Sequence, residues 1–86
     1  MEHLASISIL TTNRQRVSSQ LNDFLTKNGH LIMSRLGVNV SKNCTENCPG
    51  LIVLVLKADK EKIDSFMLGL GQIEGLEIKS CLFEDK

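Results

Sequence analysis

The order in which the hydrophobic periodicity changes along the chain is the feature that most limits its fold. Residues 4–10, "LASISIL", alternate between apolar side chains and serines, the period of two that predicts a half-buried strand. Extended character returns over residues 31–40, 51–56 and 76–83. Between these segments, two sets of apolar residues recur three and four positions apart, the spacing of amphipathic helices: Val17, Leu21, Phe24 and Leu25, then Ile63, Phe66, Met67 and Leu70.

The ends of both expected helices carry the usual signals. Thr12 and Asp59 stand where N-cap side chains are wanted. Gly29 is predicted to adopt the left-handed conformation that ends the first helix near Asn28, and Gly71 or Gly75 is predicted to close the second. The resulting order is strand, helix, strand, strand, helix, strand. It predicts an α+β fold, the ferredoxin-like βαββαβ plait, with a four-stranded antiparallel sheet and two helices on one face. Residues 1–86 are expected to form a single domain.

Such a plait leaves one face of its sheet without a covering layer. The segment "LIVLVL" at 51–56 is apolar on both sides, and a central strand of this kind usually has both sides covered. We therefore expect a homo-oligomer, a dimer or a tetramer, in which another copy packs on the open face or pairs edge to edge. The alternative is that these residues merely satisfy strand propensity.

The second expected strand carries one charged side chain. Its alternation places Ile32, Leu36 and Val38 toward the core, and Arg35 with Gly37 on the open face. Arg35 could clamp an anionic ligand there or pair with Glu77, and we favour the pair.

Composition excludes several classes of function. Ten basic residues balance ten acidic ones, so no strong field for nucleic acid is expected, and we predict no direct nucleic-acid binding. No apolar run approaches the roughly 18 residues that predict a membrane span. With no signal peptide evident at the start of the sequence, the protein is expected to be cytoplasmic and not to bind membranes.

Two of the three cysteines, Cys44 and Cys48, lie in the polar connection "SKNCTENCPG". Thiolates four positions apart could hold a soft transition metal or an iron–sulfur cluster, either together with Cys81 or with the same pair of a second chain. A reversible disulfide is a second option. We favour a solvated loop with incidental cysteines and no cofactor, because the chain offers no second ligand pair.

Three segments resemble a known family. The stretches "SISILTTNR", "GHLIMSRLGV" at 29–38 and "LGLGQIEGLEIKS" at 68–80 are similar to the small ACT-like proteins described as iron-only hydrogenase system regulators. A more distant resemblance is to the C-terminal, metal-sensing domain of the nickel-responsive repressor. There Cys48 would match a nickel ligand, but Gly37, Asn39 and Ser41 stand where histidines would be needed, so nickel sensing does not carry over.

The resemblance implies a regulatory role and no catalytic residues. It implies a ligand site between subunits, formed here by Thr11, Thr12 and Asn13 with Gly37 to Asn39 opposite, and Arg35 is a further candidate. No nucleophile, base or acid pair has a convergent partner in the sequence, so we expect no enzyme. The function predicted is a non-catalytic, oligomeric module that binds a small effector or a partner protein. The alternative is a metal or redox sensor that uses Cys44 and Cys48.

Overall fold

The computed structural model describes residues 2–11, 14–39 and 50–83. Its elements follow the expected order: β1 (Glu2–Thr11), α1 (Arg14–Lys27), a 3₁₀ turn η1 (Gly29–Leu31), β2 (Ile32–Asn39), β3 (Gly50–Asp59), α2 (Lys60–Gly71) and β4 (Leu76–Phe83). The strands form one sheet in the order β2-β3-β1-β4, with antiparallel pairing throughout. The predicted ferredoxin-like plait is confirmed.

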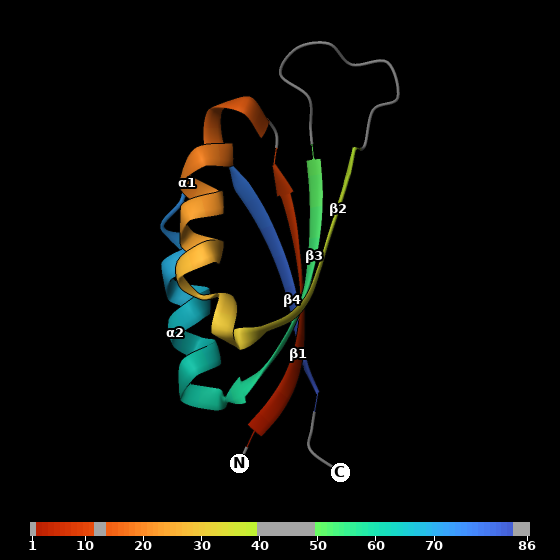
Figure 1. Ribbon diagram of the computed structural model, residues 1–86, viewed down its shortest axis with the longest axis vertical. Coiled ribbons are helices and arrows are strands. Elements are labelled where there is room, and N and C mark those ends of the chain that lie inside the picture. Colours follow the sequence, from red (N-terminus) through yellow and green to blue (C-terminus); the bar gives the residue numbers. More distant parts are fainter. Residues whose placement is uncertain (1, 12–13, 40–49, 84–86) are drawn as a thin grey trace.

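Both helices cover the same face of the sheet (Figure 1). The core lies between these two layers and is built from the alternating residues of the central strands and the stripes of the helices. Its most buried members are Ile7, Ile9, Leu54 and Leu56 from the sheet, with Leu21, Leu25, Phe66 and Leu70 from the helices. Each such side chain contributes about 1.5–3 kcal/mol on leaving water, so this one interface accounts for most of the stabilisation by burial.

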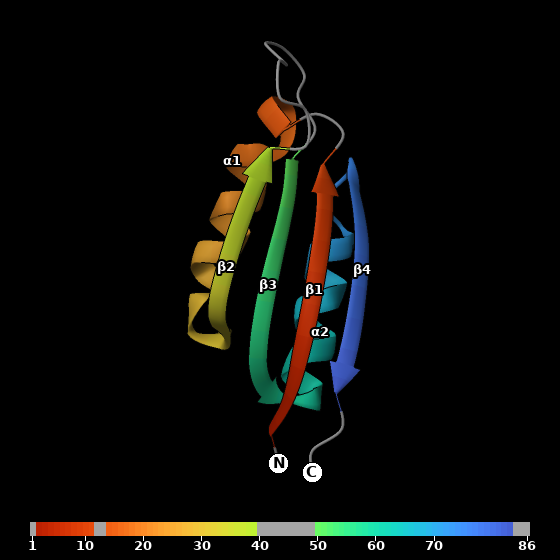
Figure 2. The same ribbon diagram turned by 90° about the vertical axis from the view of Figure 1, so that its right-hand side faces the viewer.

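The opposite face of the sheet carries no helix, and Figure 2 looks directly onto it. We call this the open face. Its apolar residues come from all four strands and alternate with the core residues in the strand register: Leu4, Leu10, Leu36, Leu51, Val53, Val55 and Phe83.

The first helix ends differently from the prediction. Gly29 does not adopt a left-handed conformation; it begins the 3₁₀ turn, and among the described glycines the positive φ belongs to Gly75 (88°). Asn28 closes the helix instead, because its backbone N–H and its side-chain amide both donate to the Phe24 carbonyl, at 3.2 and 2.9 Å. The Asn28 side chain therefore caps the helix, a role that the sequence pattern predicted for Gly29.

The second helix follows its predicted boundaries. Asp59 occupies the N-cap position with an extended backbone, although its side chain makes no capping hydrogen bond to the helix. The helix ends at Gly71, and the positive φ of Gly75 then turns the chain into β4. Both candidate glycines therefore have a role: Gly71 is the last residue of the helix, and Gly75 forms the turn that follows it.

One predicted face assignment is wrong. The pairing of β2 with β3 shifts between Ile32 and Ser34, so that Met33 is an extra residue on β2. A bulge of this kind reverses the alternation beyond it, because side chains point to opposite faces with a period of two. Arg35 and Gly37 therefore lie on the helix-facing side, whereas Leu36, at 60% exposure, lies on the open face.

Candidate functional site

Most of the predicted ligand residues that the structure describes gather at one end of the molecule. β1 and β2 finish there, and β3 and α1 begin there (Figure 1). In the strand register Thr11 pairs with Gly50, which pairs with Asn39, and one step along the strands Ile52 pairs with Gly37. We call the end defined by Thr11, Gly37, Asn39 and Gly50 the apex. Neighbouring strands lie about 4.8 Å apart, so Thr11 and Asn39 are separated by roughly 10 Å.

At the apex, the Thr11 side chain joins the end of β1 to the start of β3. Its side chain is 1% exposed, and its hydroxyl donates to the Gly50 carbonyl at 3.3 Å and accepts from the Gly50 N–H at 3.1 Å. A hydroxyl has one proton to donate, so the bond to Gly50 uses its whole donor capacity. Thr11 therefore fixes the geometry of the apex, and a ligand would have to approach the groups around it.

Gly37 provides the open space at the apex. It is exposed, and a Cβ placed on its backbone would meet no heavy atom within 4 Å. Glycine weakens a strand by roughly 0.5–1 kcal/mol relative to alanine, so its presence inside β2 is not explained by stability. The strand backbone at Gly37 is accessible to a ligand or to another chain.

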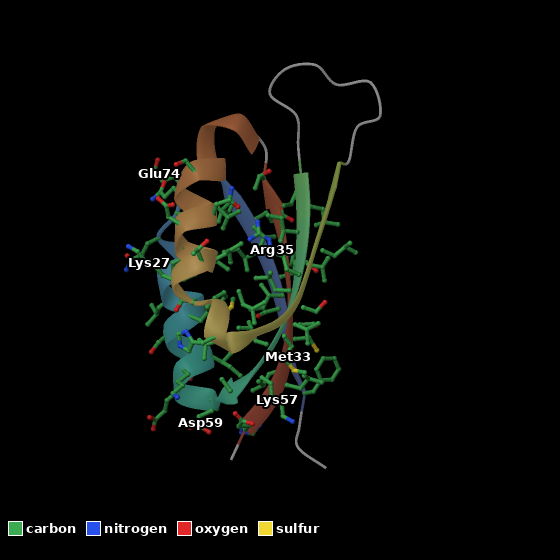
Figure 3. The ribbon with its side chains drawn as sticks, in the orientation of Figure 1. Lys27, Met33, Arg35, Lys57, Asp59 and Glu74 are labelled. Carbon is green, nitrogen blue, oxygen red and sulfur yellow. The ribbon has the colours of Figure 1, made fainter. Side chains whose placement is uncertain are left out.

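Arg35 lies two residues before Gly37 in β2 and reaches toward α1 (Figure 3). Its guanidinium donates to the side-chain oxygen of Asn22 at 2.8 Å. The predicted pairing with Glu77 is wrong, because Glu77 stands on β4 at the opposite edge of the sheet. The bulge at Met33 accounts for the error, since it turns Arg35 onto the helix-facing side. Arg35 thus joins β2 to α1, below the apex.

The other predicted site residues divide into two groups. Thr12, Asn13, Cys44 and Cys48 lie outside the described residues. Cys81 is exposed on the open face of β4, opposite Ser6 of β1. Within the described segments, no three His, Cys, Asp or Glu side chains gather closely enough to hold a metal ion. The same segments contain no helix long and apolar enough to cross a membrane.

A groove between the two helices was not anticipated from the sequence. It has one depression of about 410 Å³ beside Phe66 and another of about 310 Å³ beside Gly69, and Phe24 lines both. The rings of Phe24 and Phe66 pack with centroids 5.1 Å apart. A Cβ on Gly69 would lie 2.7 Å from the Phe24 ring, so the missing side chain lets the helices approach. A glycine inside a helical pattern was the available signal.

These features define a class of protein: a small α+β domain with a ferredoxin-like fold. The sequence comparison then gives the family. Residues 3–80 match the TM1266-like family, described as "Iron-only hydrogenase system regulator, putative", and the chain belongs to it. Among curated proteins, the sequence comparison found no match.

Solved structures agree with this assignment. The chain is similar to the protein TM1266 from Thermotoga maritima, with 28% identity and a TM-score of 0.83 over 98% of this chain and 100% of that one. A cofactor-independent oxygenase from Streptomyces nogalater, SnoaB, has 9% identity and a TM-score of 0.57, over 100% of this chain and 95% of that one. A nitrogen regulatory PII-like protein from Thiomonas intermedia has 13% identity and a TM-score of 0.51, over 100% and 99%. At such low identity the last two share the fold alone.

Proposed function

We propose that this chain is a non-catalytic, oligomeric regulatory domain of the iron-only hydrogenase system that binds a small effector or a partner protein at its apex. The observation that carries the proposal is membership of the regulator family over residues 3–80, nearly the whole chain.

The apex is the favoured binding region because it combines a rigid frame with open space. The buried bonds of Thr11 to Gly50 hold the ends of β1 and β3 together. Beside them, Gly37 leaves the strand backbone uncovered. Sites that bind small molecules are usually largely preformed, so a fixed edge next to an accessible backbone is a suitable arrangement.

Substitution at Gly37 tests the apex with little risk to the fold. Gly37→Val adds a branched side chain to a strand position with room for it, so the protein should fold at least as well as the native chain. Gly29→Ala is the matched control, because Gly29 also has no atom within 4 Å of an added Cβ but lies in the turn before β2.

The assay is complementation of a deletion strain in the native host, with hydrogenase activity as the readout. Wild-type protein and Gly29→Ala should restore the activity of the parent strain, and Gly37→Val should not. If Gly37→Val complements fully at equal protein level, the apex is not the binding region, and the regulatory role would have to act through another surface.

A further inference from the structure

We infer that the open face is the surface on which a second copy of this chain packs, sheet against sheet. This inference rests on the oligomeric part of the proposed function and names the surface that would carry it. The starting observation is the exposure of large apolar side chains on that face: Leu36 is 60% exposed, Phe83 47% and Leu4 42%. Several large apolar side chains exposed on one face of a small protein are typical of an interaction surface.

Apolar residues of three strands adjoin one another on this face. The register places Leu36 of β2 beside Val53 of β3, and Leu10 of β1 beside Leu51 of β3. The three apolar residues of β3 on this face, Leu51, Val53 and Val55, are only partly buried in the single chain. Ser6 and Ser8 of β1 lie on the same face, so its apolar part runs along β3 and onto the neighbouring residues of β2 and β1, with charged residues toward the margins. Charged residues kept to the margin are usual in protein interfaces.

The size of the open face suits a pair of copies. Four strands spaced about 4.8 Å apart, each contributing about eight residues that rise 3.3 Å, span roughly 500 Å². Two such faces in contact would cover roughly 1,000 Å², the lower bound for a specific interface, and the relief of the side chains adds to this flat estimate.

The charges around the face favour a second copy over other occupants. Along β4 the face carries Glu77 and Lys79, and at its far end the strand register adds Glu2, Lys57 and Asp59, so three acidic residues stand against two basic ones and neither sign is in large excess. Nucleic acid or an anionic membrane would require an excess of positive charge, and a strongly charged partner would require an excess of one sign. A symmetric pair instead needs a patch that complements itself, which a margin of mixed charges around an uncharged centre allows.

The apex would stay accessible in a dimer formed through the open face. Arg35 and Gly37 lie on the helix-facing side of β2, whereas the second copy would cover the other side of the sheet. An effector bound at Gly37 would therefore contact one chain only, in contrast to a site shared between subunits.

Charged substitutions separate the open face from the rest of the surface. Leu36→Glu and Val53→Glu place a carboxylate on the face, and Leu68→Glu is the matched control, because Leu68 is 71% exposed on α2 in the opposite layer. A carboxylate buried without a partner opposes association strongly, so the first two variants should weaken the dimer at least about 100-fold, and Leu68→Glu should not. Leu36 is already largely exposed, so its variant should fold even where Val53→Glu does not.

Sedimentation velocity on the full chain gives the oligomeric state, and the reactivity of Cys81 locates the interface. Cys81 lies exposed on the open face of the single chain, so a maleimide should label it more slowly as the concentration rises and dimers form. Cys44→Ser and Cys48→Ser are included in every protein so that Cys81 alone reports.

The expected result is a native dimer with protected Cys81, which becomes a monomer with rapidly labelled Cys81 in Leu36→Glu. A native oligomer that survives both open-face substitutions with Cys81 still reactive would overturn the inference and leave the oligomeric proposal standing. A native monomer at the highest soluble concentration would overturn both. A monomer that instead binds a different polypeptide through Val53 would also overturn the inference.

Discussion

The contact between Gly69 and Phe24 gives the sharpest prediction about what holds the two helices together. Replacing Gly69 by alanine places a Cβ 2.7 Å from the Phe24 ring, well inside the 3.5–4.0 Å at which carbon atoms pack favourably. The half-buried ring packs against Phe66, so moving it disturbs that pair as well. We expect Gly69→Ala to push the helices apart or to tilt the Phe24 ring.

Two opposing terms set the size of the effect. Alanine is about 1 kcal/mol more favourable than glycine inside a helix, whereas overpacking costs about 1–3 kcal/mol. Gly69→Ala should therefore lower the free energy of unfolding by about 1 kcal/mol. In a Phe24→Ala background the steric term disappears, so the same substitution should raise it by about 1 kcal/mol. The coupling energy between the two positions is then about 2 kcal/mol.

Urea denaturation at a single chain concentration, followed by circular dichroism, measures each corner of this cycle. Gly71→Ala is the matched control, because Gly71 lies in the same helix and has no atom within 4 Å of an added Cβ. It should be neutral or slightly stabilising in both backgrounds. If Gly69→Ala destabilises the protein equally with and without the Phe24 ring, the proposed close approach is not what requires glycine there.

Three further predictions concern single positions. Thr11→Val should lower the free energy of unfolding by about 2 kcal/mol, because it leaves the buried Gly50 backbone groups without their hydroxyl partner. Thr11→Ser keeps a hydroxyl and should lower it by less than half as much. Chemical denaturation of the two variants measures the difference, and equal losses would contradict the role of the hydroxyl. Asn28→Ala should cost about 1 kcal/mol through loss of its bond to the Phe24 carbonyl, and an equal loss in the exposed control His30→Ala would contradict that role. Gly37→Val should leave the melting temperature unchanged or raise it, and a clear fall would show that β2 requires glycine for its fold.

The fold followed from the sequence because its periodicity is local. The spacing of apolar residues within one element is enough to predict its buried face. This holds for the stripe of Ile63, Phe66 and Leu70 in α2 and for the alternation of Ile7 and Ile9 in β1, all of which are buried. The change of period from two to 3.6 and back then allows few arrangements, because crossover connections have a fixed hand.

The errors arose where a feature depends on tertiary context. The bulge at Met33 has no signature in the sequence, yet it reverses the faces of every later residue of β2, Arg35 and Gly37 included. The C-terminal cap of α1 was assigned to Gly29 because glycine is the usual choice, whereas Asn28 supplies an equivalent bond from its side chain.

The candidate site was only partly accessible to sequence reasoning. Thr11 and Gly37 were named, but the partner of the Thr11 hydroxyl lies 39 residues away in the sequence, and no local pattern reveals such a pair. The roles differ accordingly: Thr11 holds the apex together, and Gly37 leaves it open.

The most direct test of the regulatory role is the iron-only hydrogenase activity of otherwise identical anaerobic cultures of the native host with and without the gene. Deletion should change this activity, in either direction, and the wild-type gene supplied in trans should restore the parental value. Equal activity in the parent and deletion strains, across conditions in which the protein is present in the parent, would contradict a regulatory role.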